Sequence, residues 1–165
     1  MDISIVVPAY NAEKTIADCI NSLLKQTKKA KEIIVVDDAS SDNTAEIVKK
    51  IAKRHKEVKL ISLKENSGPA RARNIGARKA KGEIIVFVDA DCVAKENFLE
   101  EITKQIEEGK AIGVQGAYKT KQKSTVAKFS QIEIEYRYAK MLSEQRKKGS
   151  VDFIGSYAAA FKKEI

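Results

Sequence analysis

The stretch Ile84–Asp91 constrains the fold of this chain more than any other. Ile84–Val88 is a run of five apolar residues rich in β-branched side chains, and such a run predicts a strand buried on both faces of a parallel sheet. The strand ends in two carboxylates, Asp89 and Asp91, instead of a turn of Gly, Ser or Asn. In open α/β sheets, ligands bind at the carboxyl ends of the strands, so this pair predicts a ligand crevice. The alternative is a solvated turn that contains two acids.

The spacing of the two acids narrows the chemistry. Residues separated by one position in extended backbone point to the same side, so the two carboxylates repel each other across Ala90. A divalent cation that bridges to phosphate oxygens relieves this repulsion. The only histidine, His55, lies on a predicted helix away from the acidic loops, which excludes histidine-based triads and multi-histidine zinc sites. Glycine-rich dinucleotide and phosphate-loop motifs are also missing, so metal-held diphosphate is the remaining prediction.

The rest of the chain alternates short apolar runs with helical periodicity. The predicted strands cover residues 3–7, 32–36, 58–63, 84–88 and 111–118, with a further strand beginning at residue 151, and the predicted helices begin near residues 13, 44, 69, 96 and 126. This alternation predicts an α/β fold with a doubly wound, mostly parallel sheet and helices on both faces. Pro8 is expected to end the first strand's ladder, and Asn11 to cap the helix that follows.

Two more loops carry polar residues that a crevice needs, Pro8–Asn11 and Asp37–Asp42. Asp42 or Asn43 suits the start of the next helix, but Asp37 and Asp38 are not needed for that purpose. Arg71 and Arg73 lie in the first turns of a helix, where they oppose its dipole. An anionic ligand would explain them; the alternative is that they lie on the surface.

Bulk properties indicate a single domain. The chain has 165 residues, 43% of them hydrophobic, and no apolar run long enough to cross a membrane. Its first residues lack the features of a signal peptide, so we expect a cytoplasmic location. Cys19 and Cys92 are too few and too scattered for a disulfide framework or a zinc site and are expected to be buried, reduced thiols.

The positive charge is concentrated in the C-terminal part. Residues 119–165 carry 11 basic and 5 acidic side chains, so they account for +6 of the formal net charge of +8. This bias predicts peripheral contact with an anionic membrane surface or a lipid phosphate at the inner face of the membrane, and we expect no nucleic-acid partner. The alternative is a solvated lysine-rich face.

Four ordered motifs resemble family-two glycosyltransferases of the GT-A fold. They are Val6–Asn11, Val35–Thr44, Gly68–Gly76 and Val88–Asp91, and the resemblance covers nearly the whole chain. It implies a Rossmann-like, mostly parallel GT-A sheet and an enzyme that transfers a sugar from a nucleotide-diphosphate-sugar donor to a saccharide or lipid-phosphate acceptor. It also implies Mn²⁺ or Mg²⁺ as the cofactor.

The resemblance also assigns roles to individual residues. By likeness, Pro8, Ala9 and Tyr10, with Asn11 beside them, would line the nucleoside, and Asp38 would accept a hydrogen bond from the base. Arg73, together with Arg71, would contact the nucleotide, Asp89 would face the ribose or sugar, and Asp91 would ligate the metal ion.

The catalytic base is where the sequence departs from the family pattern. An inverting transferase needs a carboxylate to deprotonate the acceptor, and in the family it follows a segment like Ala159–Lys162. The base is therefore expected beyond Ile165, with residues 1–165 forming one GT-A domain truncated at its acceptor end, because Asp152 and Glu164 are poorly placed. Two alternatives are a nucleotide-sugar-binding or membrane-surface module without turnover, and a nucleotidyltransferase, for which a glycine-rich basic loop is missing.

Overall fold

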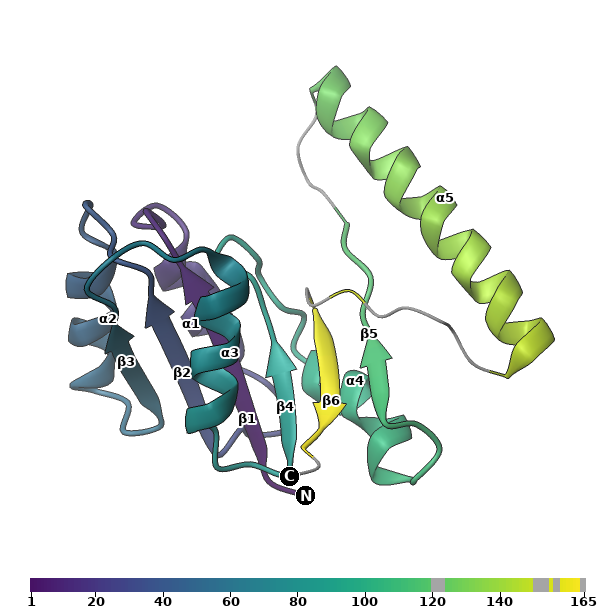
Figure 1. The fold of residues 1–165 in the computed structure, drawn as a ribbon, viewed down its shortest axis with the longest axis horizontal. Helices are drawn as coiled ribbons and strands as arrows, with labels where there is room; N and C mark the ends of the chain where they lie inside the picture. The colour runs from purple at the N-terminus through teal and green to yellow at the C-terminus, as the bar shows by residue number, and fades with distance from the viewer. Residues whose placement is uncertain (120–123, 150–154, 156–157, 164–165) are drawn as a thin grey trace.

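The computed structural model describes residues 1–119, 124–149, 155 and 158–163 (Figure 1). Helices and strands alternate along most of the chain. The elements are β1 (Ile3–Ala9), α1 (Ile16–Leu24), β2 (Glu32–Asp37), α2 (Thr44–Ala52), β3 (Val58–Ser62), α3 (Pro69–Lys79), β4 (Ile84–Phe87), α4 (Phe98–Glu107), β5 (Gly113–Gln115), α5 (Thr125–Lys148) and β6 (Ala159–Lys162).

The strands form one sheet in the order β3-β2-β1-β4-β6-β5. The pairs β1–β2, β2–β3 and β1–β4 are parallel, whereas β6 pairs antiparallel with both β4 and β5. The prediction of a mostly parallel α/β sheet is therefore confirmed. The parallel half brings the carboxyl ends of β1, β2 and β4 to one edge, which is where a ligand crevice forms in such sheets.

Helices cover both faces of the sheet, as predicted. Buried side chains of α1, α2 and α4 pack on one face, and α3 packs on the other through a smaller apolar cluster that includes Val6 and Ala72. Close contact on the α3 side depends on Gly76, because a Cβ there would lie 2.3 Å from Cγ1 of Val6. The small residues of α3 therefore bring this helix directly onto β1.

Pro8 was expected to end the hydrogen-bond ladder of the first strand, but it ends the ladder on one side of β1 only. The β1–β4 pairing stops near Val6, whose carbonyl accepts the N–H of Val88 at 3.1 Å. On the other side β1 continues to pair with β2 as far as Ala9 and Asp37. The missing N–H of Pro8 faces the β4 side, because alternate residues of a strand bond to opposite neighbours, so the β2 ladder is not interrupted.

The C-terminal part differs from the predicted elements in length. The strand predicted for residues 111–118 covers only Gly113–Gln115. Its length follows its pairing with β6, in which these three residues lie opposite Ala159–Phe161. The predicted start of the last strand at residue 151 lies outside the described residues, as do Asp152 and Glu164. Within the described residues, no helix combines the length and apolar character that a membrane span requires.

Candidate functional site

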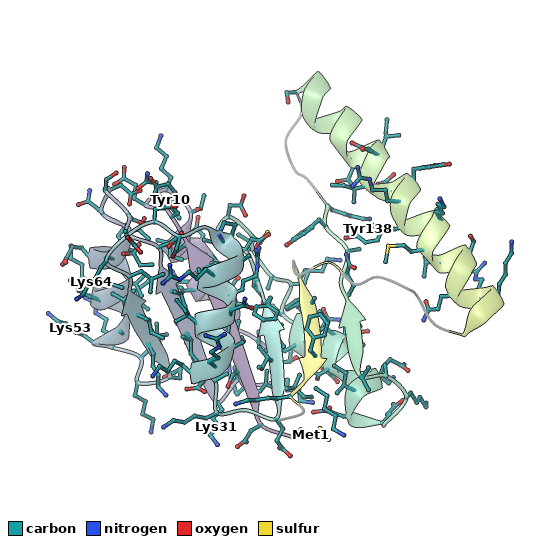
Figure 2. The ribbon with its side chains drawn as sticks, viewed as in Figure 1. Met1, Tyr10, Lys31, Lys53, Lys64 and Tyr138 are labelled. Carbon is teal, nitrogen blue, oxygen red and sulfur yellow. The ribbon has the colours of Figure 1, made fainter. Side chains whose placement is uncertain are left out.

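A cleft of about 640 Å³ opens where β1, β2 and β4 end. Three loops and α3 form its walls, and Tyr10 marks this edge of the sheet in Figure 2. Pro8 and residues 10–15 line it from β1 and the loop that follows, Asp42 from the loop after β2, Pro69 and Arg73 from α3, and residues 89–91 from the end of β4. The structure thus brings together all three loops that the sequence predicted to carry a ligand.

Asn11 joins two of these loops instead of capping α1. Its backbone adopts a left-handed conformation with φ of 48°, and its N–H donates to Oγ of Ser40 at 2.9 Å. Its side-chain oxygen accepts the N–H of Ser41, also at 2.9 Å. The predicted cap is wrong because α1 begins only at Ile16, after an intervening turn. Asn11 instead fixes the loop after β1 to the loop after β2.

Asp42 strengthens the same connection. One carboxylate oxygen accepts the N–H of Glu13 at 3.0 Å, and the other accepts the N–H of Thr44, the first residue of α2, at 2.9 Å. Oγ1 of Thr44 in turn accepts the N–H of Ala12 at 2.8 Å. Hydrogen bonds within the protein therefore hold the two loops together and fix this wall of the cleft.

Asp38 lies beside the cleft but not among its lining residues. It is 3% exposed, and one oxygen accepts the N–H and hydroxyl of Ser67 at 2.9 and 3.0 Å. The other oxygen accepts the N–H of Gly68 at 2.7 Å, and Gly68 has a φ of 85°, a conformation that suits glycine. Asp38 therefore holds the loop that leads into α3.

Asp89 is held from two sides. Nη2 of Arg73 donates to its Oδ1 at 2.5 Å, and the Tyr118 hydroxyl donates to its Oδ2 at 3.2 Å. The Arg73 side chain is only 15% exposed, so this ion pair is stronger than one at the surface. Burial, and then the charge of Asp89, raises the pKa of Tyr118, so the phenol stays protonated and remains a donor.

Asp91 is exposed and faces the cleft. The thiol of Cys92 lies 3.6 Å from its Oδ1, and the thiol of Cys19 lies 3.5 Å from the backbone oxygen of Asp89. Burial raises the pKa of Cys92 to about 11 and that of Cys19 to about 12, so both cysteines are protonated thiols at neutral pH. Both cysteines are free, as expected, but only Cys19 is buried, whereas Cys92 is half-buried.

The structure separates the two arginines of α3. Arg73 lines the cleft, whereas Arg71 is exposed on another side of the helix, with Nη1 3.7 Å from Oε1 of Glu65. Arg71 lines a separate, smaller groove beside Ser67 and Ile75. Ala9 is also absent from the lining of the cleft, because it is buried at the end of β1.

Sequence reasoning missed several residues of the site. Tyr118 was expected to belong to a strand, and Asp42, although part of a predicted crevice loop, was given no role of its own beyond that of a helix cap. Lys14 and Thr15 line the cleft because the turn before α1 is longer than the periodicity indicated. A polar, non-periodic stretch between residues 10 and 15 was the available signal for the last two.

Comparison with curated proteins identifies relatives that are glycosyltransferases. Glycosyltransferase GlyG of Streptococcus pneumoniae is 41% identical over 116 residues, covering 70% of this chain and 38% of GlyG. The poly(ribitol-phosphate) beta-N-acetylglucosaminyltransferase TarS of Staphylococcus aureus is 40% identical over 111 residues, covering 66% of this chain and 19% of TarS. The chain thus spans about two fifths or less of the length of these relatives.

Solved structures share the fold. A TarS structure in complex with UDP-GlcNAc superposes with a TM-score of 0.66 and 36% identity, over 76% of this chain and 37% of that one. The mannosyltransferase PcManGT from Pyrobaculum calidifontis, in complex with GDP-Man and Mn²⁺, superposes with a TM-score of 0.78 and 25% identity, over 97% of this chain and 44% of that one. The expected GT-A fold is therefore confirmed. Because the model of glycosyl transferase family 2 matches residues 4–165, the chain belongs to that family.

Proposed function

We propose that this chain binds a nucleotide-diphosphate sugar in the cleft and takes part in transferring the sugar to an acceptor. One observation carries the proposal: Asp91 is exposed in the cleft, two residues from an Asp89 that Arg73 and Tyr118 hold in place. An exposed carboxylate beside a fixed one, at the carboxyl end of a parallel strand, suits a metal-bound diphosphate next to a ribose. UDP-GlcNAc in TarS and GDP-Man in PcManGT support this class of donor.

The donor's parts match successive regions of the cleft. Pro8 and the half-exposed Tyr10 offer apolar surface for the nucleoside at the end of β1. Asp38 would read the base from beside this surface, where its Oδ2 accepts one hydrogen bond within the described residues, from the N–H of Gly68. Asp89 would accept from the ribose or sugar, while Arg73 fixes the orientation of that carboxylate. Of the two arginines of α3, we assign this function to Arg73, because it lines the cleft.

The metal site fits the same arrangement. Within the described residues no group of three or more His, Cys, Asp or Glu side chains converges on one point, so the protein alone does not form a metal cage. Mg²⁺ and similar ions in phosphate sites bind through one or two carboxylates, with the substrate phosphates and water completing the shell. We therefore assign Asp91 as the protein ligand of Mn²⁺ or Mg²⁺. A divalent ion there would neutralise the charge that develops on the leaving diphosphate.

The acceptor is proposed to be a saccharide or a lipid phosphate. The name of TarS specifies a poly(ribitol-phosphate) acceptor, which supports a polymer or phosphate-linked acceptor for this chain as well. Direct displacement by the acceptor hydroxyl inverts the anomeric carbon and needs a carboxylate as the base. We propose that the reaction inverts and leave the base unassigned.

Helix α5 supports peripheral membrane contact. Ile132, Tyr136 and Lys140 are spaced by four residues, lie along one row of the helix and are all exposed. Arg146 and Lys147 are exposed on the following turns. Figure 1 shows α5 standing apart from the sheet. Sedimentation with phosphatidylglycerol vesicles, but not with phosphatidylcholine vesicles, is the expected result, and equal sedimentation with both would contradict it.

Isothermal titration calorimetry tests the donor assignment. UDP and GDP are titrated into the protein with Mn²⁺ and, in parallel, with EDTA. We expect one of the two to bind, and binding to weaken strongly without the metal. The sugar forms of the better nucleotide are then incubated with lipid-phosphate and saccharide acceptors, and products are separated by chromatography. Donor binding without transfer favours a binding module, whereas no binding of either nucleotide overturns the proposal.

A further inference from the structure

The segment of residues 116–119, here called the connecting segment, lies between β5 and the α5 region. The N–H of Gly116 donates to the backbone oxygen of Ala158 at 2.7 Å, which anchors the segment beside β6. A Cβ at Gly116 would lie 3.1 Å from that same oxygen, which is a tight contact, so a larger residue here would require the backbone at Ala158 to shift slightly. The connecting segment is thus fixed to the antiparallel part of the sheet.

Helix α5 holds the connecting segment from the other side. The hydroxyl of Tyr138 donates to the backbone oxygen of Gly116 at 3.0 Å, and Nε2 of Gln131 lies 3.4 Å from the backbone oxygen of Tyr118. Figure 2 shows Tyr138 between α5 and the segment that follows β5. The backbone that carries Tyr118 is therefore set by both β6 and α5.

From this backbone the side chain of Tyr118 reaches the acidic motif. Its hydroxyl lies 3.2 Å from Oδ2 of Asp89, and Arg73 occupies Oδ1 of the same carboxylate. A carboxylate held through one oxygen can still rotate about its side-chain torsions, whereas contacts to both oxygens fix the plane of the group. Asp89 thus has one support from α3 and a second from the connecting segment.

We propose that Tyr118 is a positioning residue of the donor site, whose hydroxyl orients Asp89 for the nucleotide. The inference rests on the proposed function, because it assumes that Asp89 meets the donor. Tyr118 does not contact the donor in this scheme. It acts by keeping the Asp89 carboxylate in the bound orientation before the ligand arrives, which avoids the cost of ordering that side chain on binding.

The test compares two tyrosine-to-phenylalanine substitutions. Tyr118→Phe keeps the ring but removes the hydroxyl that bonds to Asp89. Tyr138→Phe is the matched control, because it removes a hydroxyl that bonds to the same segment without contacting Asp89. Calorimetry uses UDP or GDP, whichever the wild-type protein binds more tightly, with Mn²⁺. We expect Kd to rise roughly fivefold in Tyr118→Phe, since a hydrogen bond to a charged group is lost, and less than about twofold in Tyr138→Phe.

A double-mutant cycle with Asp89→Ala isolates the mechanism. If Tyr118 acts through Asp89, Tyr118→Phe causes no further loss of affinity once the carboxylate is absent. The same fivefold loss in the Asp89→Ala background overturns the inference, as does an equal loss in Tyr118→Phe and Tyr138→Phe. A lower melting temperature for Tyr118→Phe with unchanged Kd also overturns it, because the tyrosine would then be purely structural.

The outcomes separate this inference from the proposed function. A wild-type protein that binds neither UDP nor GDP overturns both. A wild-type protein that binds one of them with Mn²⁺, together with a Tyr118→Phe variant of unchanged affinity, leaves the proposed function standing and overturns only the role of Tyr118.

Discussion

The two ends of the parallel sheet both carry buried or half-buried carboxylates, but they use them differently. At the amino end, Glu32 is 1% exposed, and its Oε1 accepts the Ser4 hydroxyl at 2.8 Å and the N–H of Lys81 at 2.6 Å. Its Oε2 accepts from Nζ of Lys59 at 2.5 Å. At the carboxyl end, the protein occupies both oxygens of Asp89 but leaves Asp91 exposed in the cleft. Figure 2 shows the two edges, marked by Lys31 and by Tyr10.

The difference shows how to separate a structural acid from a functional one. The partners of Glu32 neutralise its charge, and they also join the start of β2 to β1 and to the turn before β4, where Gly82 donates to the Ser4 hydroxyl at 2.8 Å. Such a group contributes to stability, and because it is buried among its protein partners a ligand cannot reach it. Asp91 contributes little to the fold, so its place in the cleft is better explained by a ligand.

Removal of Asp91 is expected to have the largest effect on binding. Asp91→Ala should weaken Mn²⁺-dependent binding of UDP or GDP by roughly 10²-fold, because it deletes the assigned metal ligand. The melting temperature should not change, since the side chain is exposed. Calorimetry and thermal melting measure the two effects. The control is Asp18→Ala, which removes an exposed carboxylate of α1 outside the cleft. Equal metal-dependent affinity in wild type and Asp91→Ala would contradict the assignment.

Removal of Glu32 should give the opposite pattern. Glu32→Ala leaves the buried Ser4 hydroxyl and the N–H of Lys81 without their acceptor, and it should lower the free energy of unfolding by about 2 kcal/mol. Urea denaturation measures this loss. The control Glu46→Ala removes only an exposed pair with Lys49 and should change stability by less than about 0.5 kcal/mol. If Glu32→Ala weakens donor binding while the fold stays intact, the division between a structural acid at the amino end and a functional acid at the carboxyl end is wrong.

The sequence predicted the carboxyl edge well because its signals are local. Apolar runs such as Ile33–Val36 and Ile84–Val86 are buried on both faces, and the acids that follow them lie at the sheet edge as expected. A chain cannot bury five apolar residues and continue directly into Asp89 without reaching an edge. Both the fold class and the place of the cleft follow from that constraint.

The contacts that organise the site could not be predicted in this way. Asp89 and Tyr118 are 29 residues apart, and a hydrogen bond between residues so far apart leaves no periodic pattern in the sequence. The insertion of β6 between β4 and β5 depends on pairing over more than 40 residues, which also shortens β5. Asn11 was assigned to a cap from its residue type, but its positive φ turns the side chain toward Ser41. Each of these features depends on which segments meet in space.

Asp38 is expected to affect both stability, as Glu32 does, and ligand binding, as Asp91 does. It is buried and accepts hydrogen bonds through both carboxylate oxygens, as Glu32 does, but it holds the loop that precedes Pro69 and Arg73, which line the cleft. Asp38→Ala should therefore lower the free energy of unfolding by about 1–2 kcal/mol and weaken nucleoside and nucleoside-diphosphate binding alike, by roughly tenfold. Calorimetry with uridine or guanosine and with the matching diphosphate measures the second effect. A loss confined to the diphosphate would mean that Asp38 reads the phosphates and not the base.

The smallest expected effect is a dependence of the free energy of unfolding on pH, which arises from Glu32 at the amino end of the sheet. Burial alone would raise the pKa of Glu32, but the hydrogen bonds from Lys59, Lys81 and Ser4 together lower it below its usual value of 4.5. A carboxyl with a lowered pKa in the folded state stabilises the protein fully above its unfolded pKa, and this contribution is lost as the pH falls through the folded pKa. The unfolding free energies of wild type and Glu32→Gln should therefore differ most at neutral pH and converge as the pH falls below 4.5.

Urea denaturation at a series of pH values measures this convergence, and Glu96→Gln, which removes an exposed carboxylate outside the network, is the control. The control should change the free energy of unfolding little throughout the series, because its side chain is exposed. Curves for wild type and Glu32→Gln that stay parallel down to acid pH would show that Glu32 has the same pKa folded and unfolded. In that case the hydrogen bonds at the amino end would only cancel the effect of burial on the pKa of Glu32, and the comparison with the carboxyl end would rest on the geometry of the partners alone.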